Sequence, residues 1–173
     1  MGDNVNIFAS NQIQSRLANI SGENIQFDAA NSNICVKKLI SSANLITIEK
    51  EDPCTLPKAC KNSVEIEGMK KCHIRDAVAE CNFLAWLDKE VESGNLHDEG
   101  ILADKLDSFR AQQNGFRGIS FGTISAAGSN AAMCHYSHKN QEKPSKLEMD
   151  SVYLVDSGGQ YLDGTTDITR TVA

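Results

Sequence analysis

Two aspartates near the end of the chain, Asp156 and Asp167, have the side-chain type and the spacing to hold a metal ion. They lie eleven residues apart, each in a segment with the alternating pattern of a β-strand. If the segments pair as one antiparallel hairpin about a midpoint between Tyr161 and Leu162, the two carboxylates are directly opposite, with Cβ atoms about 4.5–5.5 Å apart. Carboxylates that close repel each other unless a cation lies between them. Hard oxygen ligands favour Mn²⁺ or Mg²⁺ over Zn²⁺.

Two helices are expected to position these segments. Asn62 and Glu65 have the spacing of a capping box, and a helix is predicted from there to about residue 93, closed by Gly94. A second helix is predicted over residues 98–113, with Gly115 as its stop. Apolar residues recur every three or four positions in both helices and are predicted to face inward. They are Val64, Met69, Cys72, Val78, Cys81, Leu84, Leu87 and Val91 in the first helix, and Ile101, Leu102, Leu106 and Phe109 in the second.

Strands are predicted over residues 119–125 and 131–136, around a turn at residues 128–130, before the aspartate hairpin. Helices followed by antiparallel strands are typical of an α+β fold rather than a doubly wound sheet. The sequence therefore predicts two helices packed on antiparallel strands over residues 62–173.

The first part of the chain has shorter, alternating elements, with helices predicted over residues 11–18 and 30–43 and strands over residues 24–28 and 45–48. Pro53 and Pro57 discourage helix through Lys58. We therefore predict that residues 1–52 are the end of an α/β domain and that residues 53–61 are a linker.

Composition limits the classes of partner. With a net charge of −6 and acids interleaved with bases, neither nucleic acid nor an anionic membrane surface is expected to be the main partner. No apolar stretch approaches the ~20 residues of a membrane span. The six cysteines form no Cys-x-x-Cys pair, and no export signal is recognised, so reduced thiols and a cytoplasmic location are expected.

The run from Asp156 to Thr171, DSGGQYLDGTTDITRT, resembles the metal-binding hairpin of the pita-bread metallopeptidases, and most closely that of the Xaa-Pro aminopeptidases (aminopeptidase P). The resemblance extends upstream through residues 121–136 and 56–77, so it covers roughly residues 53–173. It implies that residues 62–173 are the first half of a pita-bread (creatinase/aminopeptidase) domain. Residues 1–52 would then be the end of a creatinase-like N-terminal domain.

The resemblance also implies the roles of individual residues. Two divalent metal ions, Mn²⁺ above all, would be held by five side chains, with Asp156 a terminal ligand and Asp167 the bridging one. A His and two Glu ligands are expected beyond the last residue of this chain. His135 would lie near the scissile carbonyl and donate a hydrogen bond to the developing oxyanion. One extra residue between His135 and Asp156, relative to the family spacing, is placed in the loop of residues 137–146.

The implied activity is removal of an N-terminal residue that precedes proline, by metal-activated water, from peptides with proline in second position. The protein would be a homodimer when complete, or would associate with the missing half. Two other classes stay open, a non-catalytic interaction module and an inert fragment of the family.

Individual residues also have structural explanations. His135 could be an ordinary half-buried strand histidine, and Asp163, beside Gly164, is predicted to be a turn residue. Cys134 and His138 lack a second ligand pair at zinc-finger spacing, so zinc is not predicted there.

Overall fold

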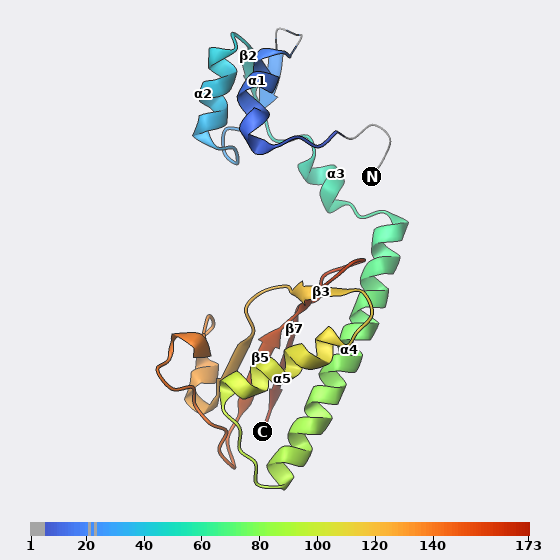
Figure 1. Cartoon of the computed structure of the whole chain (residues 1–173), viewed down its shortest axis with the longest axis vertical. Helices are drawn as coiled ribbons and strands as arrows, with labels where there is room; N and C mark the ends of the chain where they lie inside the picture. Colours follow the sequence, from blue (N-terminus) through green and yellow to red (C-terminus); the bar gives the residue numbers. More distant parts are fainter. Residues whose placement is uncertain (1–5, 21, 23) are drawn as a thin grey trace. The chain divides into compact units, whose positions relative to one another are not determined.

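A computed structural model describes residues 6–20, 22 and 24–173. The chain divides into two compact units, Met1–Lys61 and Asn62–Ala173. The elements of the first unit are η1 (Ser10–Gln12), α1 (Ile13–Ala18), β1 (Asn24–Phe27), α2 (Ile34–Ser42), β2 (Ile46–Glu49) and α3 (Thr55–Ala59) (Figure 1). β1 and β2 pair in parallel, and α2 connects them.

Two predictions in this unit needed correction. α2 begins at Ile34 rather than near residue 30, because Asp28 accepts hydrogen bonds from the backbone N–H groups of Ala30 and Asn31 and holds that segment in a turn. The short helix α3 contains Pro57, where no helix was expected. Pro57 is the third residue of α3, and a backbone N–H in the first turn has no acceptor within the helix, so its absence costs little.

The second unit contains α4 (Ser63–Glu92), α5 (Glu99–Ala111), β3 (Phe116–Ile119), β4 (Ile124–Ala127), η2 (Gly128–Ala132), η3 (His138–Asn140), β5 (Tyr153–Ser157), β6 (Gly159–Tyr161) and β7 (Ile168–Val172). β4, β5 and β7 form an antiparallel sheet with β5 in the middle, and β3 pairs separately with β6. The core lies between this sheet and the two helices, as α4 and α5 both contribute buried side chains to it (Figure 1). The predicted α+β class is confirmed.

Both ends of α4 agree with the sequence. The Asn62 side chain accepts from the Glu65 backbone N–H at 2.9 Å, and the Glu65 carboxylate accepts from the Asn62 backbone N–H at 2.8 Å. This is the reciprocal capping box. After Glu92 the chain turns at Gly94, whose φ of +80° is a left-handed conformation that glycine adopts without steric cost.

The buried face of α4 differs from the predicted one. Val64 and Val78, predicted to face inward, are 79% and 48% exposed. Of the predicted positions, Cys72 and Leu87 are buried, and the other buried residues of the helix are Gly68, Asp76, Ala79, Glu80 and Phe83. A search for apolar residues misses this face because two of its central positions are carboxylates. In α5 the inward positions Leu102 and Leu106 are confirmed, whereas Ile101 is exposed.

The strand predictions between α5 and β5 were partly wrong. The predicted strand over residues 119–125 is two strands, since β3 pairs with β6 while β4 pairs with β5. Residues 131–136 are not a strand, because the chain leaves β4 into η2 and a turn. In the described part of the chain, none of the helices combines the length and hydropathy of a membrane-spanning segment.

Candidate metal site

Asp156 lies on the central strand of the three-stranded sheet, between Ile124 of β4 and Thr169 of β7. Its neighbours Val155 and Ser157 are buried on the face that packs against the helices. Because side chains alternate along a strand, Asp156 points to the opposite face. Its Oδ1 atom is buried and has no hydrogen-bond partner in the described residues.

The predicted direct opposition of the two aspartates is wrong. The residue opposite Asp156 is Thr169, and Asp167 directly precedes β7, two residues away from Thr169. Asp167 therefore belongs to the same face as Asp156 but lies diagonally from it, a relation that corresponds to about 7–8 Å. The hairpin register differs because the residues between the aspartates do not form a simple turn. They include β6, which leaves the sheet to pair with β3.

Ser120 holds together the two chain segments that lie just inside the aspartates. Its backbone N–H donates to the Gly158 carbonyl and its hydroxyl donates to the Thr166 carbonyl, both at 2.9 Å. Thr166 in turn accepts from the Gly159 backbone N–H at 2.8 Å. A Cβ atom at Gly158 would collide with the Thr166 carbonyl and the Ser120 hydroxyl. The close approach of the two segments thus requires glycine at this position.

The turn beyond β6 rests directly on α4. The carbonyl of Asp163 occupies the space where Gly68 would carry a Cβ, and a Cβ at Gly164 would collide with the sulfur of Cys72. The Asp163 carboxylate forms an ion pair with Arg75. Asp163 lies in a bend, so its prediction as a turn residue is confirmed. Two glycines and one ion pair therefore fix the turn between the aspartates to the helix.

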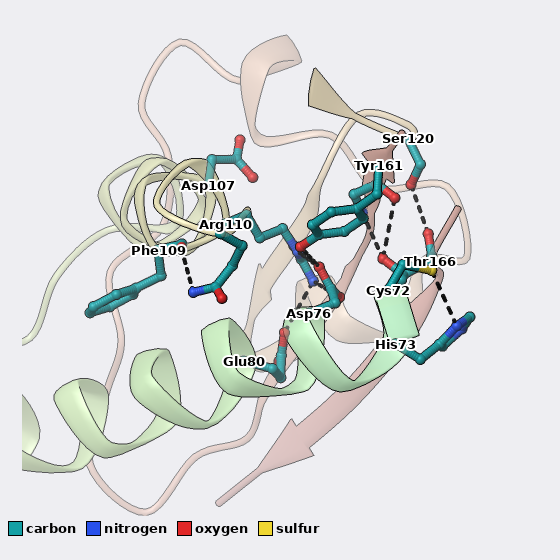
Figure 2. A network of polar contacts seen from close by, with 12 residues as sticks. Cys72, His73, Asp76, Glu80, Asp107, Phe109, Arg110, Ser120, Tyr161 and Thr166 are labelled. Carbon is teal, nitrogen blue, oxygen red and sulfur yellow. Dashed lines mark hydrogen bonds and ion pairs between the residues drawn. The ribbon is translucent and has the colours of Figure 1, made fainter. Parts of the chain in front are cut away.

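A buried cluster of charged residues lies beside this turn (Figure 2). Arg110 of α5 donates from Nε to Asp76 Oδ1 at 2.8 Å, and from Nη2 to Asp76 Oδ2 and Glu80 Oε2, both at 3.2 Å. The hydroxyl of Tyr161 in β6 donates to Asp76 Oδ1 at 2.8 Å. The side chains of Asp76 and Arg110 have no exposed surface. This cluster is not predicted from the sequence, because charged residues on helices are usually exposed.

Burial changes the protonation of this cluster. Removal of the Glu80 carboxyl from water raises its pKa above the ordinary value of 4.5, and the positive charge of Arg110 only partly opposes this effect. Burial likewise raises the pKa of Tyr161, with a further contribution from its hydrogen bond to Asp76. Tyr161 is therefore a neutral hydrogen-bond donor at physiological pH.

The raised pKa of Glu80 predicts a pH dependence of stability. Above pH 4.5 the folded chain holds this proton more tightly than the unfolded chain, so stability falls as the pH rises through the folded-state pKa. Glu80→Gln keeps an oxygen acceptor for Arg110 and is expected to remove that fall. Relative to the parent chain, the variant should gain stability in urea unfolding as the pH rises above 4.5. The exposed Glu142→Gln is the control, and an equal pH profile in the parent and Glu80→Gln would contradict the expectation.

His135 lies in an exposed turn after η2, not in a strand. The loop that carries it is held at both ends by the buried carboxylate of Glu99. Glu99 Oε1 accepts from the Ala127 backbone N–H at 2.8 Å, and Oε2 accepts from the Tyr136 hydroxyl at 2.6 Å and the Ser145 backbone N–H at 3.1 Å. Burial and the hydrogen bond to Glu99 raise the pKa of Tyr136 to about 12, so this phenol also remains protonated.

The other histidine and cysteine near His135 do not form a metal site with it. Cys134 is exposed while His138 is buried in η3. Across residues 6–20, 22 and 24–173, no three or more His, Cys, Asp or Glu side chains gather closely enough to hold a metal ion.

Comparison with known proteins defines the class to which this fold and site belong. Residues 67–173, well over half of the chain, match metallopeptidase family M24. The chain belongs to this family.

Within the family, the curated relatives that the chain matches include Xaa-Pro aminopeptidases. The chain is 46% identical over 144 residues to Xaa-Pro aminopeptidase 1 of Dictyostelium discoideum and 49% identical over 125 residues to Xaa-Pro aminopeptidase ApepP of Drosophila melanogaster. These alignments cover 82% and 72% of this chain but 22% and 20% of the relatives. The chain thus spans about a fifth of the length of the curated relatives it matches.

Solved structures confirm the fold. The X-prolyl aminopeptidase of Caenorhabditis elegans, described as a cytosolic enzyme with a di-nuclear active site, aligns with a TM-score of 0.79 and 34% identity, over 94% of this chain and 27% of that one. The X-Pro aminopeptidase of Thermotoga maritima, at 22% identity, supports the fold alone, with a TM-score of 0.69 over 93% of this chain and 43% of its own. The predicted partial pita-bread domain is confirmed.

The two aspartates fit a hard divalent cation. The buried Oδ1 of Asp156 lacks a donor in the described part of the chain, and a cation beside it would supply the missing partner. Asp167 is exposed on the same face and free to ligate. Two carboxylates alone leave most positions of an octahedral ion to water, so further ligands are needed for tight binding.

Proposed function

We propose that this chain supplies two metal-ligating aspartates, Asp156 and Asp167, to an Xaa-Pro aminopeptidase. The substrates are peptides with proline in second position, and the reaction removes the residue before that proline. The observation that carries the proposal is the buried, unpartnered oxygen of Asp156 on the same sheet face as Asp167. The similarity to Xaa-Pro aminopeptidases, at 46–49% identity, supports the substrate class.

Asp156 and Asp167 would hold two divalent ions, with Mn²⁺ the proposed metal. When bound, these ions activate a water and polarise the carbonyl that precedes proline. The central strand fixes Asp156 from both sides, whereas Asp167 is fixed through the Thr166 contacts just before it. The sheet therefore fixes the position of Asp156, and the turn fixes the position of Asp167.

His135 is proposed to donate a hydrogen bond to the oxyanion that develops on the scissile carbonyl. Its exposure leaves the imidazole accessible to a peptide, while Glu99 fixes both ends of its loop. The N-terminal domain assignment, the cytoplasmic location and the homodimer stay predictions.

The test is hydrolysis of an Xaa-Pro-Pro tripeptide with added Mn²⁺, measured for this chain alone and for the intact polypeptide that contains it. An Xaa-Ala-Pro tripeptide is the matched control substrate. We expect Mn²⁺-dependent release of the first amino acid from the proline peptide only, and in the intact polypeptide above all, since two ligands make a weak site. Failure of the intact polypeptide to cleave at any Mn²⁺ concentration, together with no thermal stabilisation by Mn²⁺, would support a non-catalytic interaction module instead.

A further inference from the structure

Between the two aspartates, Tyr161 of β6 is almost fully buried, and its ring packs edge-on against Phe116 with the ring centroids 5.7 Å apart. Its hydroxyl donates a hydrogen bond to Asp76 of α4 (Figure 2). Asp76 is itself held by two hydrogen bonds from Arg110 of α5. Three elements, α4, α5 and β6, thus meet at one carboxylate.

We propose that Asp76 and Arg110 act through Tyr161 as positioning residues for the metal-ligating aspartates, an inference that rests on the proposed function. The link from Tyr161 to Asp167 is short. The Tyr161 backbone N–H donates to the Gly164 carbonyl at 2.8 Å, and the Thr166 backbone N–H donates to the Gly159 carbonyl at 2.9 Å. Thr166 directly precedes Asp167, so a shift of β6 moves Asp167.

The same shift leaves Asp156 in place. Asp156 lies on the central strand and is held by β4 on one side and β7 on the other. Movement of β6 would therefore change the separation of the two carboxylates, and with it how well they can hold metal ions together. The anchor on Tyr161 fixes that separation because Asp76 is bound at both oxygens by Arg110 and cannot follow a moving hydroxyl.

Stability alone does not explain a charged anchor at this place. Apolar residues of similar size are commonly as stabilising as a buried ion pair, because the ion pair must first lose its water. The cluster also leaves Glu80 Oε1 and Arg110 Nη1 without hydrogen-bond partners among the described residues. What the ion pair supplies, and apolar packing does not, is an acceptor for the Tyr161 hydroxyl at a fixed position and direction.

The test compares two Tyr→Phe variants, each of which loses one buried hydroxyl. Tyr161→Phe removes the bond to Asp76, and Tyr153→Phe removes a bond to Ser125 that does not involve the turn. Electron paramagnetic resonance measures the Mn²⁺ affinity of the intact polypeptide. This affinity should fall by about 10–100-fold in Tyr161→Phe. It should change by less than about twofold in Tyr153→Phe, although both variants lose thermal stability.

Hydrogen exchange at the Thr166 amide gives a second readout without metal, and it should be faster in Tyr161→Phe than in Tyr153→Phe. Equal Mn²⁺ affinity and equal exchange in the two variants would overturn the inference. Asp167→Asn separates this failure from failure of the proposed function, since a metal affinity unchanged by Asp167→Asn would overturn the metal site itself. If Tyr161→Phe does not fold, Asp76→Asn, which keeps an oxygen for Tyr161 but loses the ion pair, takes its place in the same comparison.

Discussion

Replacing Asp167 with asparagine is expected to lower Mn²⁺-dependent hydrolysis of Xaa-Pro peptides by about 10³-fold, measured as kcat/KM in the intact polypeptide. The neutral amide is a poorer metal ligand than the carboxylate it replaces, and metal polarisation contributes several kcal/mol to such reactions. At 1.36 kcal/mol for each tenfold change in rate, the loss reaches that magnitude. Metal affinity, followed by titration with Mn²⁺, should fall with it.

The Asp167→Asn substitution should not lower the stability of the chain. Within the described residues, the Asp167 carboxylate makes neither a hydrogen bond nor an ion pair, so its replacement removes no contact and should change the free energy of unfolding by less than about 0.5 kcal/mol. The control is Asp150→Asn, an exposed aspartate with a φ of 58° that asparagine also tolerates. Equal losses of activity in the two variants would contradict the assignment of Asp167 as a ligand.

Replacing Arg110 with alanine is expected to destabilise the second unit by about 3–5 kcal/mol, because it leaves the carboxylates of Asp76 and Glu80 buried without a counter-charge. Urea unfolding of the chain measures this change. Arg117→Ala, at an exposed position on β3, should cost less than about 0.5 kcal/mol. A cost for Arg110→Ala as small as that of the control would mean that the carboxylates find other partners or bind protons.

A triple variant separates stability from positioning in the same cluster. Changing Asp76→Leu, Glu80→Leu and Arg110→Met together removes all of the buried charge and should recover most of the stability lost in Arg110→Ala. Because Asp76→Leu removes the acceptor of the Tyr161 hydroxyl, the Mn²⁺ affinity of the triple variant should be low. Recovery of both stability and metal affinity would show that the ion cluster has no positioning role.

The sequence was sufficient wherever a structure depends on residues close together in the chain. The capping box of Asn62 and Glu65 and the stop at Gly94 were predicted correctly, because each involves hydrogen bonds or backbone angles within a few residues. The family and the α+β class were also correct, since the run around Asp156 and Asp167 is long and specific. The residue types alone indicated carboxylate chemistry.

Tertiary structure determined what depends on distant partners. The register between β5 and β7 places Thr169, not Asp167, opposite Asp156, because β6 leaves the hairpin to pair with β3, a strand about forty residues earlier in the chain. The buried face of α4 could not be predicted from apolar spacing, because two of its carboxylates become buried only when Arg110 of α5 lies beside them. A local pattern reports the preferences of one segment, whereas register and the burial of charge are set by whichever segment packs against it.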